Sequence, residues 1–237
     1  ANLVAHLSPA ERRWQPLLGA RPVRSVMAIV ITANRGLCGG YNHNVIQAAM
    51  TFIARQSVLV HVVTVGRRGS SFLARQGVAI VADFDMPDRP SLEAARPIAR
   101  LLMADLQRGL VDQVWLVYTG FVSLTVQRPT VRLLLPLEAS LGEATARAGA
   151  PYLFEPRKQR ILRPILHRIT ELQIYQALLE ASASEHSARM VAMRTASENG
   201  RNLIGELTVR YNKARQEAIT KELSDIIIGA AALTRNT

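Results

Sequence analysis

The last third of the chain carries a seam of apolar and small residues at coiled-coil spacing. From Leu162 the positions step alternately by three and four residues, which is the heptad spacing of a supercoiled helix. The seam comprises Leu162, Ile165, Ile169, Leu172, Gln176, Leu179, Ala183, His186, Met190, Met193, Ser197, Gly200, Ile204, Leu207, Tyr211, Ala214 and Ala218. No proline follows Pro164, which suits a first helical turn, so the pattern predicts one helix from there to about Leu233. Such a helix would be roughly 100 Å long, and its seam needs a partner helix or a cavity, since the chain has no second seam.

The segment from residue 23 to residue 136 alternates short apolar runs with amphipathic stretches. The runs predict strands at 26–31, 58–65, 78–81 and 114–119, and a fifth strand at either 122–127 or 131–135. The amphipathic stretches predict helices at 44–55, 68–76 and 92–108. Alternation of this kind predicts an α/β domain with a mostly parallel, Rossmann-like sheet, followed by the very long helix.

Charge and cysteine content narrow the class of protein. The formal net charge is +11, and of the 29 basic residues only Lys158, Lys213 and Lys221 are lysines. A polyanion, an acidic protein and an anionic membrane surface all remain open as partners, but no nucleic-acid recognition motif occurs. The single cysteine, Cys38, excludes an internal disulfide and favours a reducing compartment. No apolar run approaches the roughly 20 residues that span a bilayer.

A glycine-rich loop after the first predicted strand is the main candidate for chemistry. It lies where a doubly wound fold binds phosphate, but its spacing is not that of a dinucleotide fingerprint, and no Gly-Lys pair occurs. We expect a structural turn formed by Gly36, Gly39 and Gly40, with a nucleotide- or phosphate-binding enzyme as the alternative. Cys38 is expected to be a buried structural thiol rather than a reactive one.

Other polar clusters give little sign of catalysis. Asp83, Asp85 and Asp88 lie in a loop that could bind a cation, although such loops are more often turns and caps. The five histidines show no metal-ligand spacing, and none of the common catalytic motifs is present. We therefore predict a protein that is not an enzyme and that holds no cofactor or metal.

Several motifs together resemble the gamma subunit family of F-type ATP synthases. Residues 219–232 match the C-terminal signature of that family, and residues 211–216 just upstream are also characteristic of it. Further similarity lies at 35–42, 88–91 and 154–156, so the resemblance covers the whole chain in the right order.

The resemblance implies a particular organisation of the chain. The family has a long helix at each terminus, and the two wind into an antiparallel coiled coil. This chain retains only the end of the first helix, at about residues 1–7, which would explain the unpaired seam. The expected division is the end of the N-terminal coiled-coil helix and a linker at 1–20, the α/β domain at 21–137, a connector at 138–160 and the long coiled-coil helix at 161–237.

The resemblance also implies a mechanical function. The family forms the central rotor shaft, which couples ion-driven rotation of the c-ring to conformational change in the catalytic beta subunits. Its partners are three alpha and three beta subunits, epsilon and the c-ring. The expected location is peripheral, at the cytoplasmic face of a bacterial plasma membrane, with an organelle inner membrane not excluded. Nucleic acid is not expected as a partner.

The implied contact residues fall into three groups. The resemblance assigns contact with a beta subunit to Arg215, Gln216 and Thr220. It assigns the shaft tip, held in an apolar bearing, to Ile226, Ile227, Ile228 and Leu233. It assigns contact with the c-ring to Phe154 and Glu155. A DNA- or RNA-binding coiled-coil dimer is a third reading, which tight RNA binding at physiological salt would favour.

Overall fold

The computed structural model describes residues 17–19, 21–137 and 158–234 of the chain. The chain divides into two compact units, residues 1–191 and 192–237, which are described separately below. The predicted end of an N-terminal helix and most of the predicted connector lie outside the described residues. The predicted four-part division of the chain therefore stays a prediction.

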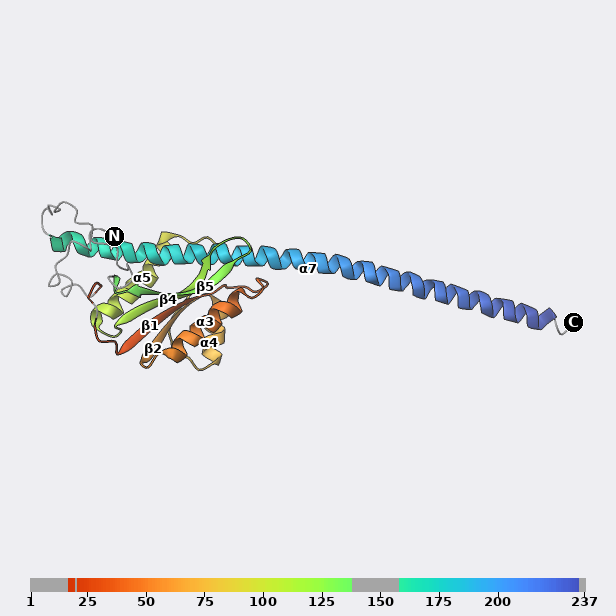
Figure 1. The fold of residues 1–237 in the computed structure, drawn as a ribbon, viewed down its shortest axis with the longest axis horizontal. Coiled ribbons are helices and arrows are strands. Elements are labelled where there is room, and N and C mark those ends of the chain that lie inside the picture. The colour runs from red at the N-terminus through yellow and green to blue at the C-terminus, as the bar shows by residue number, and fades with distance from the viewer. Residues whose placement is uncertain (1–16, 20, 138–157, 235–237) are drawn as a thin grey trace. The chain divides into compact units, whose positions relative to one another are not determined.

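A five-stranded, mostly parallel sheet forms the centre of the first unit (Figure 1). Its strands lie in the order β3-β2-β1-β4-β5. Strands β1 to β4 pair in parallel, and β5 runs antiparallel to β4. The bounds are Ser25–Ile31 for β1, Leu59–Val65 for β2, Ile80–Phe84 for β3, Gln113–Phe121 for β4 and Gln127–Leu135 for β5. The predicted mostly parallel sheet is confirmed, and the fifth strand is the later of the two alternatives, extended by four residues.

Three shorter helices connect the strands close to where the sequence predicts them. Their bounds are Tyr41–Arg55 for α3, Arg67–Arg75 for α4 and Leu92–Arg108 for α5. Helix α5 matches the prediction at both ends because its ends carry strong signals. The hydroxyl of Ser91 accepts a hydrogen bond from the backbone N–H of Ala94 at 3.2 Å, and Gly109 ends the helix in the left-handed region.

The predicted long helix is α7, Lys158–Thr234, a single helix of 77 residues. Its predicted start was wrong, because Pro164 lies inside the helix rather than in its first turn. Proline lacks the N–H that would bond the carbonyl four residues back, and its ring crowds that carbonyl, but at Pro164 this affects only the first turns of the helix. The residues before Pro164 therefore extend the helix.

Alternate residues of the central strand face the two sides of the sheet. Met27, Ile29 and Ile31 join a core that includes residues of α5 and α7. Val30 points to the other side, where Val45 of α3 and Leu73 of α4 pack against it. Helices α5 and α7 thus cover one face of the sheet, and α3 and α4 cover the other (Figure 1).

Within the first unit, α7 packs on the sheet domain mainly through a face other than its seam. This buried face recurs at helical spacing and comprises Leu162, Leu166, Thr170, Ile174, Ala177, Ala181 and Ser184. The seam shares Leu162 with it, and Ile169 of the seam also packs against the core, but Leu172, Leu179 and Ala183 of the seam are exposed. From residue 170 to residue 190 the helix therefore has a buried face and an exposed seam, of which the sequence pattern indicated only the seam.

Candidate functional site

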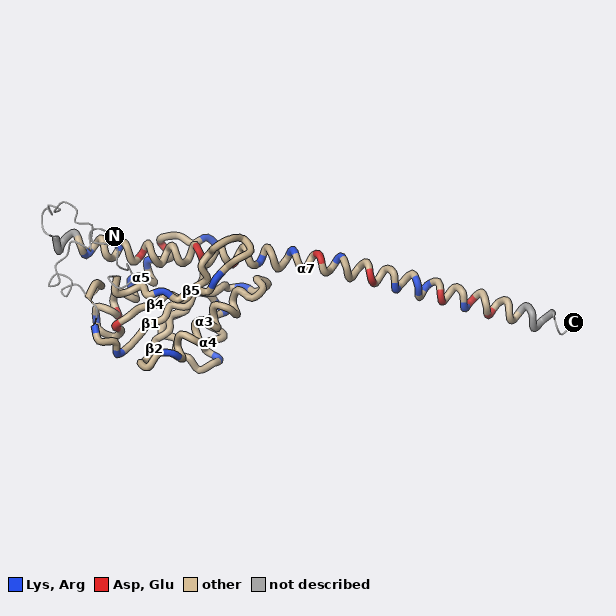
Figure 2. The backbone as a smooth tube through the Cα atoms, in the orientation of Figure 1, with Lys and Arg blue, Asp and Glu red and all other residues tan. Residues whose placement is uncertain are grey.

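The second unit is a helix whose side chains lie in solvent. We call residues 192–229 the arm, and every side chain from Met193 to Gly229 is exposed. Charges of both signs alternate along it (Figure 2). Large apolar side chains are interspersed with them, namely Met193, Leu203, Ile204, Leu207, Val209, Tyr211, Ile219, Leu223, Ile226, Ile227 and Ile228. Contiguous exposed apolar surface of this kind marks an interaction site.

The predicted beta-subunit contacts lie on the arm, and all three are exposed. Gln216 and Thr220 are one helical turn apart on the same side of the helix. Arg215 forms no ion pair within the described residues, so its guanidinium keeps its fork of N–H donors available for a carboxylate. By contrast, the Lys213 ammonium lies 3.9 Å from the Glu217 carboxylate.

The predicted shaft tip is apolar around most of the helix. Ile226, Ile227 and Ile228 are each about two-thirds exposed and follow one another at about 100° intervals. The helix continues through Leu233, whose side chain lies outside the described part, as do Phe154 and Glu155. An end that is apolar over so much of its circumference is unlike the amphipathic surface of an ordinary solvated helix.

The glycine-rich loop forms a tight turn between β1 and α3. Of the three glycines predicted there, Gly39 has a positive φ of 56°, and the neighbouring Leu37 has one of 61°. Neither Gly36 nor Gly40 has a positive φ. A Cβ on Gly36 would lie 3.1 Å from the guanidinium of Arg68, and one on Gly40 would lie 3.3 Å from the Asn44 amide nitrogen, and both of these exposed side chains can move aside.

Asn42 holds this turn together through its side-chain amide. Its Oδ1 accepts a hydrogen bond from the backbone N–H of Ala33 at 3.0 Å. Its Nδ2 donates to the carbonyl of Arg35 at 3.3 Å and to Sγ of Cys38 at 3.1 Å. These bonds close the turn on itself, which leaves it a poor cradle for phosphate and does not favour the nucleotide-binding alternative.

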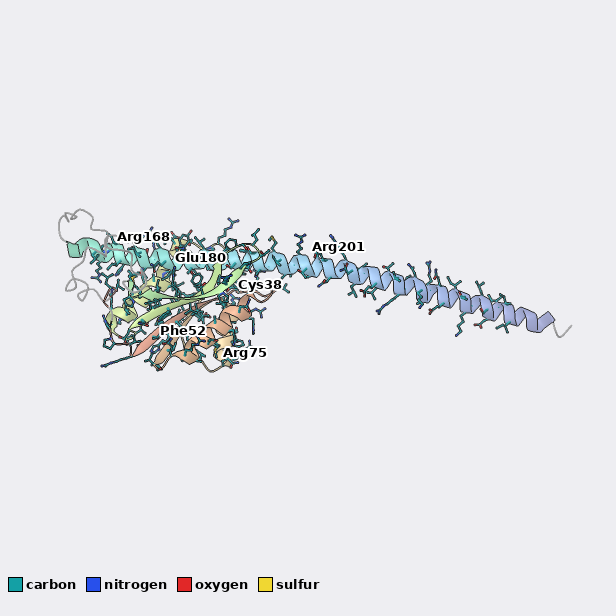
Figure 3. All side chains as sticks on the ribbon, in the orientation of Figure 1. Cys38, Phe52, Arg75, Arg168, Glu180 and Arg201 are labelled. Atoms are coloured by element: carbon teal, nitrogen blue, oxygen red, sulfur yellow. The ribbon has the colours of Figure 1, made fainter. Side chains whose placement is uncertain are left out.

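The turn also packs against α7, a contact that the sequence analysis missed. Cys38 and Tyr41 form a small buried cluster with Ala33, and Ala188 of α7 packs against it. Figure 3 shows Cys38 beside α7. The Tyr41 hydroxyl donates to the carbonyl of Ala181 at 3.1 Å. The small residues of α7 at this place were the only signal in the sequence, because they permit close approach of another backbone.

Burial fixes the protonation of the two titratable groups in this cluster. Burial raises the pKa of the Cys38 thiol, although the Arg189 guanidinium acts in the opposite direction. Burial also raises the pKa of Tyr41 far above its ordinary value, and the nearby Glu185 carboxylate adds to this. At neutral pH Cys38 is therefore a thiol rather than a nucleophilic thiolate, and Tyr41 is a hydrogen-bond donor.

Two of the three aspartates near the end of β3 are used for structural contacts, and the expectation that all three lie in a loop was wrong for Asp83, which lies within β3. Asp83 accepts hydrogen bonds from the hydroxyls of Thr64 at 2.6 Å and Ser70 at 3.0 Å. The Asp85 carboxylate pairs with Arg67 at 3.1 Å. Asp88 lies at a cavity of about 150 Å³ that Arg35 and other residues also line. Among the described residues no group of three or more His, Cys, Asp or Glu side chains could hold a metal ion.

Solved structures share this fold. A chain in the cryo-EM structure of the Tetrahymena thermophila mitochondrial ATP synthase central stalk and c-ring matches with a TM-score of 0.62 and 24% identity, over 76% of this chain and 79% of that one. A chain of the Euglena gracilis mitochondrial ATP synthase matches with a TM-score of 0.65 and 17% identity, over 96% of this chain and 81% of that one. At these identities the likeness shows the fold.

Sequence comparison shows the family. A family model described as ATP synthase matches residues 1–233. The ATP synthase gamma chain of Dehalococcoides mccartyi is 45% identical over 219 residues, which are 92% of this chain and 76% of the relative. That of Chloroflexus aurantiacus is 43% identical over 238 residues, which are 99% and 81% of the two chains. Among the described helices none combines the length and apolar character that a membrane span needs. The sheet domain, the long helix and these relatives agree, and the chain belongs to the gamma chain family of ATP synthase.

Proposed function

We propose that this chain is the central rotor shaft of the catalytic sector of an ATP synthase. It is a non-catalytic subunit that turns with the c-ring and imposes different conformations on three catalytic beta subunits. The observation that carries the proposal is the arm, on which every side chain from Met193 to Gly229 is exposed. A helix with this surface is built to be surrounded by other proteins.

The physical basis of the coupling is population shift. A single helix has no threefold symmetry, so it presents a different set of side chains to each of three equivalent subunits around it. Each subunit is then biased toward a different conformation, by no more than the difference in contact free energy between its conformations. Rotation of the arm exchanges these biases in sequence, and ATP synthesis or hydrolysis follows at the beta subunits.

Arg215, Gln216 and Thr220 are the proposed contacts with a beta subunit. The guanidinium of Arg215 has no ion-pair partner among the described residues and suits a carboxylate-bearing loop. Gln216 and Thr220 add hydrogen-bonding groups one helical turn apart. These contacts would form in one orientation of the arm and break as it turns.

The two ends of the shaft have different proposed partners. Ile226, Ile227, Ile228 and Leu233 form a tip that turns in an apolar bearing of the alpha and beta subunits. Phe154 and Glu155 contact loops of the c-ring, and the epsilon subunit binds beside them. The complex is membrane-associated, and we place this chain peripherally at the cytoplasmic face of a bacterial plasma membrane, since the relatives named above are bacterial.

The proposed beta contact is tested by the double variant Arg215→Ala with Gln216→Ala. Losing hydrogen bonds to a charged partner should lower coupled ATP synthesis roughly tenfold in membrane vesicles that carry an imposed proton gradient. The matched control is Arg201→Ala with Asn202→Ala, another exposed arginine and amide on the arm. Synthesis at the wild-type rate in the first variant would remove Arg215 and Gln216 from the contact.

The shaft function itself is tested by native mass spectrometry of the complex that contains this chain in its source membranes. We expect one copy with three alpha and three beta chains, released as an ATPase. A chain that ran alone, as a homodimer or with RNA would contradict the proposal. Micromolar nucleotide binding by the isolated chain would instead support the alternative enzyme that uses the Gly36–Gly40 loop.

A further inference from the structure

Three polar contacts tie α7 to the sheet domain near the last residues of the first unit. The Tyr41 hydroxyl donates to the carbonyl of Ala181 at 3.1 Å, and the Ser184 hydroxyl donates to the carbonyl of Thr119 at 3.1 Å. Further along the helix, Nη2 of Arg189 donates to the carbonyl of Gly36 at 3.4 Å. We call Tyr41, Ser184 and Arg189 the clasp.

The clasp is possible because α7 carries small residues where it meets the sheet domain. Ala181 and Ser184 are fully buried, and Ala188 packs on the Cys38–Tyr41 cluster. With no large side chain between them, the side chains of Tyr41, Ser184 and Arg189 can each reach a backbone carbonyl across the interface. The contacts come from two separate parts of the domain, the turn after β1 and the end of β4.

The Glu185 carboxylate holds the Arg189 side chain in the orientation that its contact with the Gly36 carbonyl requires. Its Nη2 lies 2.7 Å from the Glu185 carboxylate one helical turn earlier, and the two side chains are only 26% and 13% exposed. The pair Arg194–Glu198 has the same spacing, at 3.2 Å, but is 82% and 58% exposed and lies wholly on the arm. Only the first pair is held in place by its surroundings.

The last turns of α7 on the sheet domain bury mainly small side chains, namely Ala181, Ser182, Ser184 and Ser187, whereas its earlier turns bury Leu166, Ile174 and Leu178. Small side chains interdigitate less than large ones, so packing resists twist least in these last turns. Hydrogen bonds are directional and weaken steeply when donor and acceptor are turned apart. The contacts of the clasp therefore add resistance to twist in the turns where packing supplies least.

We propose that the clasp is the torque joint of this chain, a set of positioning residues that locks the rotational register of α7 against the sheet domain. The proposal rests on the proposed shaft function. Twist applied to the sheet domain passes through the clasp into the helix immediately before the arm begins. Without the clasp, the last turns of α7 on the domain, where small side chains are buried, twist and slip when the arm is loaded.

The test uses the full-length chain assembled with its alpha and beta subunits, carrying Tyr41→Phe with Arg189→Gln. Rotation driven by ATP is followed on single complexes against increasing viscous drag. Without load, rotation and hydrolysis should match the wild type. Under load, we expect slippage to rise roughly tenfold, as the loss of two hydrogen bonds predicts. Arg67→Gln breaks an exposed ion pair of the sheet domain that does not belong to the clasp, and it should leave loaded rotation unchanged.

Two further variants keep the test informative. Tyr41→Phe alone removes one buried hydroxyl and retains the ring, so it provides a folded variant if the double variant does not assemble. Tyr41→Phe with Arg189→Lys keeps the positive charge beside Glu185, so it should slip less under load than Tyr41→Phe with Arg189→Gln. A role limited to folding would instead change the melting temperature and lower loaded and unloaded rotation together.

The outcomes separate this proposal from the shaft function. Wild-type torque under load in both Tyr41→Phe and the double variant would overturn the clasp as a torque joint. The effect of Arg215→Ala with Gln216→Ala would still support the shaft. Failure of the unaltered chain to assemble with alpha and beta subunits would overturn the shaft function, and the torque joint with it.

Discussion

Leu37 has a positive φ, a backbone conformation that is usually found at glycine, as at Gly39 in the same turn. Its φ is 61°, and its side chain is 75% exposed, so no buried contact offsets the strain. A left-handed conformation costs an ordinary residue about 1–2 kcal/mol. The sequence indicated the turn through its glycines, but of these only Gly39 has a positive φ. Glycine content thus locates a turn without showing which residue carries its strain.

Replacing Leu37 should therefore change stability in a direction set by the new residue. Leu37→Asn is expected to raise the free energy of unfolding by about 0.5–1 kcal/mol, because asparagine tolerates the left-handed region. Leu37→Val is expected to lower it, because a β-branched residue tolerates this region least. Urea unfolding followed by tryptophan fluorescence measures both, since Trp115 packs on Phe52 in the sheet domain. Equal stabilities would show that this turn relaxes freely.

Tyr41 should make the first unit sensitive to alkali. Its pKa in the folded chain lies above the ordinary 10.0, so above that pH the unfolded chain loses a proton that the folded chain retains. Its contribution to stability is full below about pH 10 and is then lost by up to about 1.4 kcal/mol per pH unit. Unfolding of the wild type and of Tyr41→Phe is compared from pH 8 to pH 11. The other titrating groups are the same in both proteins. If the free energy of unfolding fell equally with pH in the wild type and in Tyr41→Phe, Tyr41 would therefore not be the cause.

Helix α7 shows why one face of an element can be predicted and another missed. The seam was visible because its leucines, isoleucines and methionines recur at heptad spacing. The buried face contains Leu166 and Ile174, but it also contains Thr170, Ala181 and Ser184, and these small or polar residues make its second half indistinct from a solvated surface. What buries it is the sheet domain and the β1–α3 turn, which lie far away in sequence. Local pattern carries no such information.

The strands show the same limit in a milder form. Strands β1 and β4 were predicted well, because apolar runs buried on both faces are distinctive. The position of β5 was left open because the hairpin between β4 and β5 carries the exposed apolar residues Val122, Leu124 and Val126. Exposed apolar side chains in a turn imitate a strand. Only the pairing with β4 resolves the two alternatives.

The two faces of α7 should respond differently to a larger side chain. Ala181→Leu places three more carbon atoms where the helix meets Tyr41 and should lower the free energy of unfolding by about 1–3 kcal/mol. Ala183→Leu makes the same change two positions away, on the exposed seam, and should be nearly neutral in the isolated chain. Thermal unfolding of the two variants gives the comparison. Equal losses would mean that the assigned buried face is wrong.

For the chain as a whole, net charge bears on how fast it meets its partners. We propose that the formal charge of +11 is matched by acidic surfaces on the beta and epsilon subunits. The net charge follows from the composition, and the absence of common catalytic motifs follows from the order of the residues. The contact residues could not be found in either way, and Arg215, Gln216 and Thr220 were assigned by resemblance alone. On the arm their surroundings resemble any solvated helix, and only a partner would distinguish them.

Association with the alpha and beta subunits should therefore depend on salt. Raising ionic strength from about 0.01 M to 0.15 M shortens the screening length from about 30 Å to about 8 Å. We expect the association rate of the full-length chain to fall roughly tenfold or more over this range. Stopped-flow mixing with the partner subunits measures it. A rate indifferent to salt would show that the positive charge does not guide assembly.

The contacts between α7 and the sheet domain also determine when the domain can finish folding during protein synthesis. The last strand of the sheet ends at Leu135, but the face of the sheet that α7 covers stays open until the ribosome has made residues up to about Arg189. At about 5–20 residues per second this takes roughly 3–11 s. For that time a nascent chain exposes the part of this apolar sheet face that α5 does not cover. We therefore expect the nascent chain to bind chaperones at the ribosome exit, and slower translation after Leu135 to lengthen its risk of aggregation.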